Sequence, residues 1–464
     1  MFYNKGPRAE GAPPRPQLSC RSFFGLMLMK ILPPVLAGAV LARSAVARSA
    51  VVWSAVVWSG VACVGWGGPP ASRVGAETLR VVRGQPCFEL RNDAVELAVT
   101  ELGGHMAPVT FFCQSAQPVQ PYYVSPWQEE RLPALPAPVL VPLRGDFFCL
   151  PFGGNQQPVG EERHSPHGEA ASARWTPTGR ESSGGVTTLS LALKTAVRRG
   201  SVAKRLSLAA GHDVVYAQHV VEGFAGKTPL GHHATLAMPD EEGSVRIAVS
   251  PIRFGMTYPG VFSDPQLGEY QALLPGARWP GLERVPRLWK GAADADLSRL
   301  PGWQGFADLV QIVPDLSGDR AGRPAWTTAT FAAQGYLWFA LKDPRVLAST
   351  LFWMENRGRH GLPWNGRNNC LGLEDVTAYF AEGLAGSVAE NALSREGVAT
   401  ALELTESQPL VVNYIQGVVR IPAGFAQVAD VEFAPGQATF VAEGGQRVAT
   451  RVCHEFLASG KITP

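Results

Sequence analysis

The sequence predicts a mostly β protein: a large antiparallel β-supersandwich with few short helices. Short β-branched or alternating segments recur from about residue 78 onward, among them CFELRNDAVELAVTEL, TTLSLALKTA and DVVYAQHVVEG. Fifty glycines and 38 prolines indicate many turns between such segments. No regular alternation of strand and helix follows the chain, which argues against a doubly wound parallel sheet.

Later segments continue this pattern. SVRIAVS, TTATFAAQGYLWFALKD, ATALELTES and QATFVAEGG are also expected to be strands. Two stretches favour short helices, SVAENALSREG, which begins with a capping serine, and AGFAQVADVEF. No segment resembles a linker that would divide the chain, so residues 77–464 are expected to form one β-sandwich domain.

Residues 1–76 differ from the rest and are expected to be a low-complexity leader, either a signal peptide or a membrane anchor. An apolar run of about 12 residues, ILPPVLAGAVLA, follows Arg21 and Lys30, as in the core of a signal peptide. Residues 49–68 carry no charge and are long enough to cross a bilayer about 30 Å thick as a helix. We therefore expect the protein to be exported (periplasmic or extracytoplasmic) or membrane-anchored.

Charge and cysteine usage exclude several functions. The formal charge is +2 with no basic block, so no nucleic-acid partner is expected. Five of the seven cysteines follow the leader, and no C-x-x-C occurs among them. The pattern indicates neither a disulfide scaffold nor a zinc site, and it leaves the pairing of any disulfide open.

Four short segments contain the residues most suited to chemistry. They are PLRGDFFCLPFGG with Arg144, HSPHGEAASARW with His167, PLGHHATLAMPDEE with His232 and His233, and WNGRNNCLGLEDVTAYF with Glu374. Each residue alone also has an ordinary structural interpretation, such as an ion pair or a solvated loop. Adjacent residues on a strand point to opposite faces, so only one of the two neighbouring histidines can face a given cleft.

A metal site is a further interpretation of these residues. His164, His167, Glu169 and one of His232 and His233 could supply three imidazoles and a carboxylate, which is a sufficient set for zinc. The spacing, however, is neither the helical H-E-x-x-H nor that of a cupin. No metal and no cofactor are therefore expected.

Taken in order, the four segments resemble the galactose mutarotase-like superfamily, which contains the aldose 1-epimerases and the hexose-6-phosphate epimerases. Members have an arginine in R-G-G-x-P-x-C-F-P-W-F-G, then H-G with a nearby tryptophan, a strand histidine and a late glutamate. This chain has RGDFFCLPFGG, HGEAASARWTP, HHATLAMP and LGLED. Its opening, ELRNDAVELAVTELGGHMAPVTF, is similar to the first strands of the superfamily, which a Gly-Gly turn joins.

The resemblance implies an isomerase that interconverts the α and β anomers of a sugar by acid–base ring opening. Carried over by motif, Glu374 is the general base and His233 the general acid, with His232 as the alternative acid. The same comparison makes His167 and Arg144 ligands of the sugar. Trp175 is a candidate to stack on a pyranose face, as is Trp364, although both also suit a core. The expected partner is a monosaccharide or glycan.

Two other functions remain open on the same fold. One is a carbohydrate-binding protein without turnover. The other is a polysaccharide-processing enzyme such as a lyase, for which Tyr258, Tyr270 and Arg253 lie in the long segment before Glu374. A fold alone does not separate these functions.

The polar segment ENRGRHGLPWNGRNN adds a last prediction. It ends at Asn369, shortly before Glu374, and contains Arg357, Arg359, His360 and Arg367. Its position beside Glu374 favours contacts with the sugar over a purely solvated loop.

Overall fold

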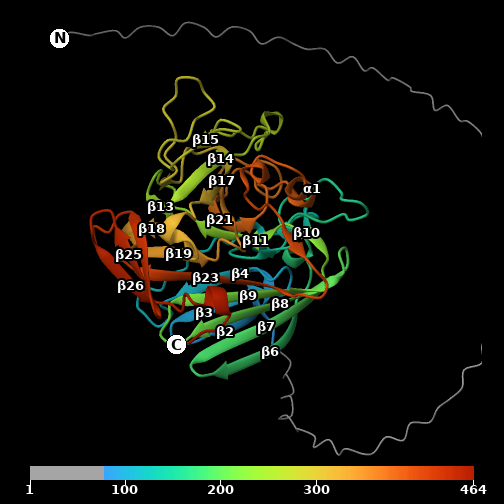
Figure 1. Ribbon diagram of the computed structural model, residues 1–464, viewed down its shortest axis with the longest axis vertical. Coiled ribbons are helices and arrows are strands. Elements are labelled where there is room, and N and C mark those ends of the chain that lie inside the picture. The colour runs from blue at the N-terminus through green and yellow to red at the C-terminus, as the bar shows by residue number, and fades with distance from the viewer. Residues whose placement is uncertain (1–77, 464) are drawn as a thin grey trace, which may run out of the picture. The chain divides into compact units, whose positions relative to one another are not determined.

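Two large antiparallel sheets dominate the computed structural model, which describes residues 78–463. The larger has nine strands in the order β16-β13-β18-β19-β23-β9-β8-β7-β6. Figure 1 shows β6 to β9 and β23 side by side in this sheet. The bounds are β16 Arg299–Leu300, β13 Val245–Val249, β18 Ala325–Phe331, β19 Tyr336–Lys342, β23 Leu410–Arg420, β9 Val214–Glu222, β8 Gly200–Ala209, β7 Val186–Thr195 and β6 Thr176–Ser183.

The second large sheet has eight strands and carries the candidate site. Its order is β15-β14-β17-β20-β21-β11-β5, and β12 also pairs with β21. The bounds are β15 Arg278–Trp279, β14 Ile252–Thr257, β17 Phe306–Pro314, β20 Ser349–Asn356, β21 Asn369–Thr377, β11 Leu230–His232, β12 Ala234–Ala237 and β5 Phe148–Cys149.

Three smaller sheets and two short helices complete the described residues. One sheet contains the first four strands in sequence order, a second contains β24, β25 and β26, and a third pairs β10 with β22. Their bounds are β1 Arg80–Val82, β2 Gln85–Arg91, β3 Val95–Thr100, β4 Met106–Phe111, β24 Val428–Ala434, β25 Gln437–Ala442, β26 Arg447–Arg451, β10 Gly226–Thr228 and β22 Leu402–Leu404. The helices are α1 Gly383–Val388 and α2 Phe456–Ser459. The mostly β prediction is thus confirmed.

Strand β19 shows why the central strands read as continuous apolar runs. All seven of its residues are buried. Trp338 and Ala340 face the core between the large sheets. Leu337 and Phe339 face the other way and pack with the three-stranded sheet of β24 to β26. A strand covered on both faces has no polar side to display.

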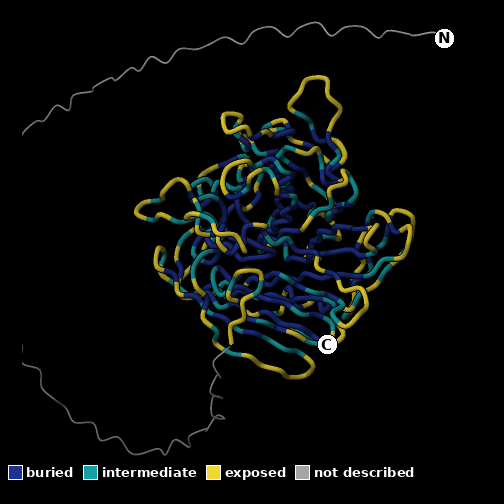
Figure 2. The backbone as a smooth tube through the Cα atoms, turned by 180° about the vertical axis from the view of Figure 1, so that it is seen from behind, coloured by how far each residue is buried: buried dark blue, intermediate teal, exposed yellow. Residues whose placement is uncertain are grey.

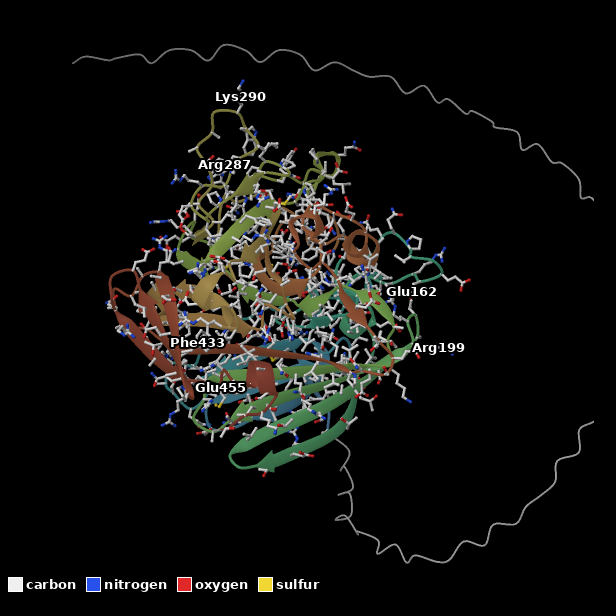
Figure 3. All side chains as sticks on the ribbon, viewed as in Figure 1. Glu162, Arg199, Arg287, Lys290, Phe433 and Glu455 are labelled. Carbon is white, nitrogen blue, oxygen red and sulfur yellow. The ribbon has the colours of Figure 1, made fainter. Side chains whose placement is uncertain are left out.

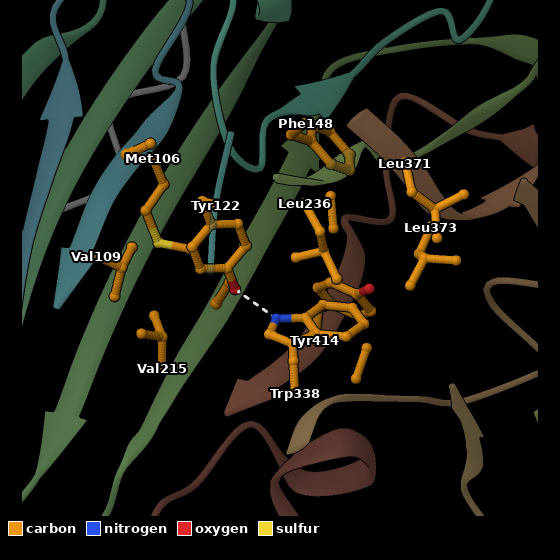
Figure 4. Packing of buried hydrophobic residues seen from close by; sticks show 14 of the residues in the cluster. Met106, Val109, Tyr122, Phe148, Val215, Leu236, Trp338, Leu371, Leu373 and Tyr414 are labelled. Atoms are coloured by element: carbon orange, nitrogen blue, oxygen red, sulfur yellow. Dashed lines mark hydrogen bonds between the residues drawn. The ribbon is translucent and has the colours of Figure 1, made fainter. Parts of the chain in front are cut away.

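The core between the large sheets includes a polar contact. Tyr122 Oη donates a hydrogen bond to Gln416 Oε1 at 2.6 Å and accepts one from Trp338 Nε1 at 3.2 Å, the dashed line in Figure 4. Figure 2 shows that, within residues 78–463, the buried backbone runs through the middle and the exposed backbone lies mainly in the loops.

Outcomes for the individual elements follow the side-chain pattern. The Gly-Gly turn between β3 and β4 is present, and Gly103 and Gly104 both have positive φ, at 72° and 60°. A Cβ at Gly103 would lie 2.4 Å from the carbonyl oxygen of Ala171, so the turn requires glycine there. The helix predicted over SVAENALSREG is present only in part, because α1 ends at Val388 and a single 3-10 turn covers Ser394–Glu396.

The helix predicted over AGFAQVADVEF is wrong, because β24 covers its second half. Within the described residues all five cysteines are free, and no helix is long and apolar enough to cross a membrane. The predicted leader lies in residues 1–76, outside the described residues, and stays a prediction.

Candidate functional site

A cavity of about 250 Å³ lies against one face of the eight-stranded sheet. Its polar lining residues come from β21, the junction between β11 and β12, and two loops. Its walls are mostly apolar. The lining consists of Ala137, Val139, Leu140, Leu143, Phe147, Pro166, His167, His233, Phe262, Leu309, Trp353, Arg359, Trp364, Glu374 and Ala381.

The pleat of two neighbouring strands decides which side chains reach this cavity. Gly231 pairs with Val376 and Ala234 pairs with Leu373, so the two histidines lie opposite Glu374 and Asp375. Successive side chains on a strand point to opposite faces. His233 and Glu374 therefore face the cavity. Only one of the two neighbouring histidines can do so, and it is His233.

His233 and Glu374 form a buried contact. His233 Nε2 lies 3.2 Å from Glu374 Oε1, and the side chains are 7% and 4% exposed. Thr235 Oγ1 lies 3.1 Å from the other ring nitrogen, His233 Nδ1, and fixes the orientation of the ring.

Burial sets the protonation of this pair. It raises the pKa of Glu374 well above the usual value of a carboxyl group. Burial also lowers the pKa of His233 well below the usual value of an imidazole, and the nearby His167 and His105 add to the effect. Burial penalises the charged form of each group, so at neutral pH the pair holds one proton and no net charge.

His167 lies beside this pair in a constrained loop. Its ring centroid is 5.0 Å from that of His233. The residue has φ 60°, in the left-handed region, and its N–H donates to the carbonyl oxygen of Gly153 at 2.7 Å. A Cβ at Gly168 would lie 1.9 Å from the Leu150 carbonyl oxygen, so the H-G pair needs its glycine.

Three buried polar atoms of the lining residues have no hydrogen-bond partner in the described part of the chain. They are His167 Nδ1 and Trp353 Nε1, and a third such atom is Arg359 Nε, which lies 3.5 Å from Glu355 Oε2. Burial lowers the pKa of His167 to about 4, so its ring is neutral at neutral pH and can both donate and accept. The His167 and Trp353 atoms are therefore free to hydrogen-bond a polar group in the cavity.

Aromatic side chains build the walls around the pair. Phe147 stacks on His233 with ring centroids 4.5 Å apart and an interplanar angle of 17°. Trp353 meets the other side of His233 edge-on at 5.6 Å, and Trp364 meets Trp353 at 5.7 Å. The polar pair is thus held in an apolar frame that restricts the movement of the imidazole.

Arg144, which was expected to bind the sugar, does not line this cavity. Its side chain is fully buried. The guanidinium donates to the carbonyl oxygens of Val82 at 2.9 Å and Arg83 at 2.8 Å, and to Gln128 Oε1 at 2.6 Å. Arg144 thus anchors the first hairpin to the loop before β5.

His232 and Trp175 are also placed away from the cavity. His232 Nδ1 donates to Asp146 Oδ2 at 2.9 Å, and its ring stacks on Tyr414 between the large sheets. Trp175 is fully buried, and its Nε1 donates to the Ala170 carbonyl oxygen at 3.0 Å. Both are structural residues here, so neither contacts a ligand in this cavity.

The other polar residues of HSPHGE belong to the surrounding loop. His164 Nε2 lies 2.8 Å from Oε2 of Glu162, which is labelled on a projecting loop in Figure 3. Glu169 accepts from the backbone N–H groups of Ala196 and Val197. Across residues 78–463, no three His, Cys, Asp or Glu side chains gather as metal ligands would.

The polar segment before Glu374 contributes two lining residues, Arg359 and Trp364. Two of its other arginines form ion pairs instead, Arg357 with Asp240 and Arg367 with Glu130. Tyr258, Tyr270 and Arg253, weighed for a lyase, do not line the cavity.

Sequence reasoning missed Trp353. The alternating side-chain directions in LFWMEN, on the strand β20 that pairs with β21, were the signal that could have identified it.

A larger open cleft of about 640 Å³ lies on the opposite face of the sheet. Asp308 and Asn356 line it, and so does Arg287, labelled in Figure 3. The Asp308 carboxylate accepts from the backbone N–H groups of Ala272 and Leu273, and burial raises its pKa to about 6. No histidine lines this cleft, so it does not repeat the acid–base pair of the smaller cavity.

Comparison with solved structures finds chains that align with this one at low sequence identity. A candidate aldose 1-epimerase from Klebsiella pneumoniae aligns with a TM-score of 0.52 at 12% identity, over 73% of this chain and 80% of that one. A galactose mutarotase-like protein from Clostridium acetobutylicum gives 0.49 at 8% identity, over 74% and 98%. A candidate mutarotase from Salmonella typhimurium gives 0.48 at 11% identity, over 74% and 93%.

The likeness is one of fold, because so little of the sequence is identical. Of the three, the Klebsiella structure has the highest TM-score and shows the shared fold. No model of a protein family matches the sequence, and no curated protein matches it significantly.

Proposed function

We propose, for a chain with the galactose mutarotase-like fold, that it is an aldose 1-epimerase-like isomerase acting on a monosaccharide. One observation supports the proposal most directly: a buried carboxyl and a buried imidazole lie 3.2 Å apart in a cavity, with the unpartnered Nδ1 of His167 beside them. Acid–base ring opening needs one proton donor and one proton acceptor, and little else.

In the proposed step, Glu374 as carboxylate takes the proton of the anomeric hydroxyl. The electron pair of that O–H bond becomes the second bond of the C1 carbonyl. The C1–O5 bond breaks, and its electron pair takes the proton of the His233 imidazolium at O5. The open aldehyde turns about C1–C2, and the reverse transfers close the ring on its other face and restore both groups.

The protonation of the free site is compatible with this step. The neutral pair and the carboxylate–imidazolium pair hold the same single proton, which only has to cross the 3.2 Å contact. The two oxygens that exchange protons are both bonded to C1, so an adjacent acid and base can reach both. The neutral His167 is proposed to hold the sugar near its ring oxygen.

The test is the rate at which the anomers equilibrate, measured by NMR exchange on α-glucose and α-galactose with the full chain. We expect acceleration by the native protein and a loss of about 10²–10⁴-fold in the Glu374→Gln variant. Glu403→Gln, at an exposed position of β22, is the matched control and should retain the native rate.

A folded native protein that accelerates no aldose would overturn the proposal. Binding of a sugar without acceleration would then support the alternative of a carbohydrate-binding protein. The expected export through residues 1–76 remains a separate proposal, which N-terminal sequencing of the mature protein would test.

A further inference from the structure

We infer that the preferred substrate is an aldose with an apolar group in place of one hydroxyl away from C1, such as a deoxy or O-methyl sugar. The inference rests on the proposed function and goes beyond it, because it names the class of sugar. It follows from how unevenly the cavity distributes its polar groups.

The polar groups of the cavity gather where the anomeric carbon would react. Glu374, His233 and His167 lie together. Trp353 contacts the His233 ring, and its Nε1 has no hydrogen-bond partner among the described residues. These groups suit the two oxygens on C1 and a neighbouring hydroxyl. Arg359 is the one other charged lining residue, and its guanidinium lies 4.9 Å from the ring centre of Phe262.

Apart from Arg359, whose guanidinium also lies 5.9 Å from the ring centre of Trp364, most of the remaining lining is hydrocarbon. Aliphatic side chains come from the loop before Arg144 and from β17, and aromatic ones from three further segments. They are Ala137, Val139, Leu140, Leu143, Leu309, Phe147, Phe262 and Trp364. None of these except the Trp364 indole offers a side-chain hydrogen-bond donor, and none offers an acceptor.

The backbone of the loop wall is largely occupied as well. The Leu140 N–H donates to the Ala137 carbonyl oxygen, and the Leu140 carbonyl oxygen accepts from Trp127 Nε1 at 2.8 Å. The Leu143 carbonyl oxygen accepts from the hydroxyl of Ser125 at 2.5 Å. Arg144, which follows this wall in sequence, is bound to other carbonyl groups.

A free hexose carries a hydroxyl on nearly every carbon. A hydroxyl moved from water against hydrocarbon loses its hydrogen bonds without replacement, which disfavours binding. A methyl or methylene group at that position loses nothing and gains contact with the wall. The preference is bounded, because an apolar pocket rejects an added hydroxyl by only about 10²-fold.

The experiment compares kcat/KM for α-glucose, 6-deoxyglucose and 3-O-methylglucose, by NMR exchange with the full native chain. We expect at least one substituted sugar to exceed glucose by about 10- to 100-fold. Equal or lower values for both substituted sugars would overturn the inference while leaving the isomerase proposal intact.

If no sugar is turned over, the isomerase proposal fails, and binding to the native chain decides the inference separately. Saturation-transfer NMR then measures the dissociation constants of the same three sugars. Tighter binding of a substituted sugar supports the inference, and equal or weaker binding of both contradicts it.

A pair of variants tests the wall itself. Val139→Thr adds a hydroxyl to the lining at nearly constant shape, and we expect it to reduce the preference for the substituted sugar about tenfold. Val139→Ala removes volume without adding a polar group and should keep the preference. Loss of the preference in both variants, or in neither, would contradict a polarity effect at this wall.

Discussion

Glu374 and His233 hold a single proton between them, and this predicts the pH dependence of the reaction. Burial lowers the pKa of His233 and raises that of Glu374. As the pH falls, the pair gains a second proton at a pH below the ordinary pKa of an imidazole. As the pH rises, the pair loses its single proton at a pH above the ordinary pKa of a carboxyl group. We expect the acid limb of kcat/KM to lie below the ordinary imidazole value and the alkaline limb above the ordinary carboxyl value, with both limbs belonging to the pair.

The profile is measured from acid to alkaline pH by the same anomer-exchange rate. An acid limb with its midpoint at pH 6.5 or above would indicate an ordinary imidazole and contradict a shared proton. In Glu374→Gln the residual rate should lose its alkaline limb, because no carboxyl remains to titrate.

Glu355 provides a prediction about stability. The Glu355 carboxyl group is buried next to Arg359, and burial raises its pKa from 4.5 to about 7. A pKa raised by folding contributes stability below the ordinary carboxyl value, and that contribution is lost as pH rises through about 7. Glu355→Gln should therefore gain stability relative to the native protein on going from pH 5 to pH 8, by on the order of 3 kcal/mol.

Urea unfolding at the two pH values measures this difference, because effects of other titrating groups cancel between the two proteins. The backbone N–H of Arg359 donates to Glu355 Oε1 at 3.0 Å, and a glutamine side chain keeps an oxygen that can accept this hydrogen bond. Parallel pH curves for the two proteins would show that Glu355 titrates normally.

Single residues also show how far the sequence leads. The order of four motifs pointed to Glu374, His233 and His167, and these are the ones that the structure brings together. The same motifs suggested Arg144, but the direction of a long side chain depends on carbonyl groups that the chain places nearby. Here those belong to Val82 and Arg83, about 60 residues away in sequence, and no local pattern encodes that contact.

At the scale of the element, the absence of a side chain at Gly372 of β21 leaves room for the Glu374 carboxyl group. Gly372 lies two residues before Glu374 on the same face, and a Cβ there would lie 2.5 Å from Glu374 Oε1 and 3.1 Å from the Trp353 Cβ. Gly372→Ala should displace the carboxyl group from His233. A shift of about 1 Å in a reacting group can cost about 10²-fold in rate, and we expect kcat to fall by up to that amount.

The matched control is Gly179→Ala in β6, where a Cβ would meet nothing within 4 Å. Both variants are assayed for anomer exchange and for thermal unfolding. A native rate in folded Gly372→Ala would show that the carboxyl position does not depend on this close approach.

The β11–β12 junction gives a second prediction at this scale. His233→Gln should lose about 10²–10⁴-fold in rate while remaining folded, because it removes one acid–base group. His232→Gln should act mainly on stability, because it breaks a buried hydrogen bond to Asp146. Equal losses of rate in both variants at unchanged stability would contradict the assignment of the two histidines to opposite faces.

Elements were predictable where alternation is strong and less so where it is interrupted. Leu189, Leu191 and Leu193 of β7 are all buried, with period two. In β24 the register shifts between Val428 and Asp430, and this bulge breaks the period. Phe425, Val428 and Val431 are then spaced three apart, which resembles a helix more than a strand.

At the scale of the whole molecule, Tyr122 connects the two large sheets. It forms a bridge with Leu236 of β12 in the eight-stranded sheet. Its hydroxyl contacts Gln416 of β23 and Trp338 of β19 in the nine-stranded sheet. Since His233 directly precedes β12, this connection fixes the strand that carries the proposed acid against the rest of the core.

Tyr122→Phe should therefore destabilise the protein by about 1–3 kcal/mol, because it leaves two buried groups without their partner. Tyr336→Phe is the matched control, since within the described residues no hydrogen bond of the Tyr336 hydroxyl is found. Urea unfolding followed by fluorescence and by circular dichroism measures both variants. A loss confined to Tyr122→Phe, with coincident transitions by both probes, would show that the two sheets unfold as one cooperative unit. Equal effects of the two variants would mean that the hydroxyl bridge does not couple the sheets.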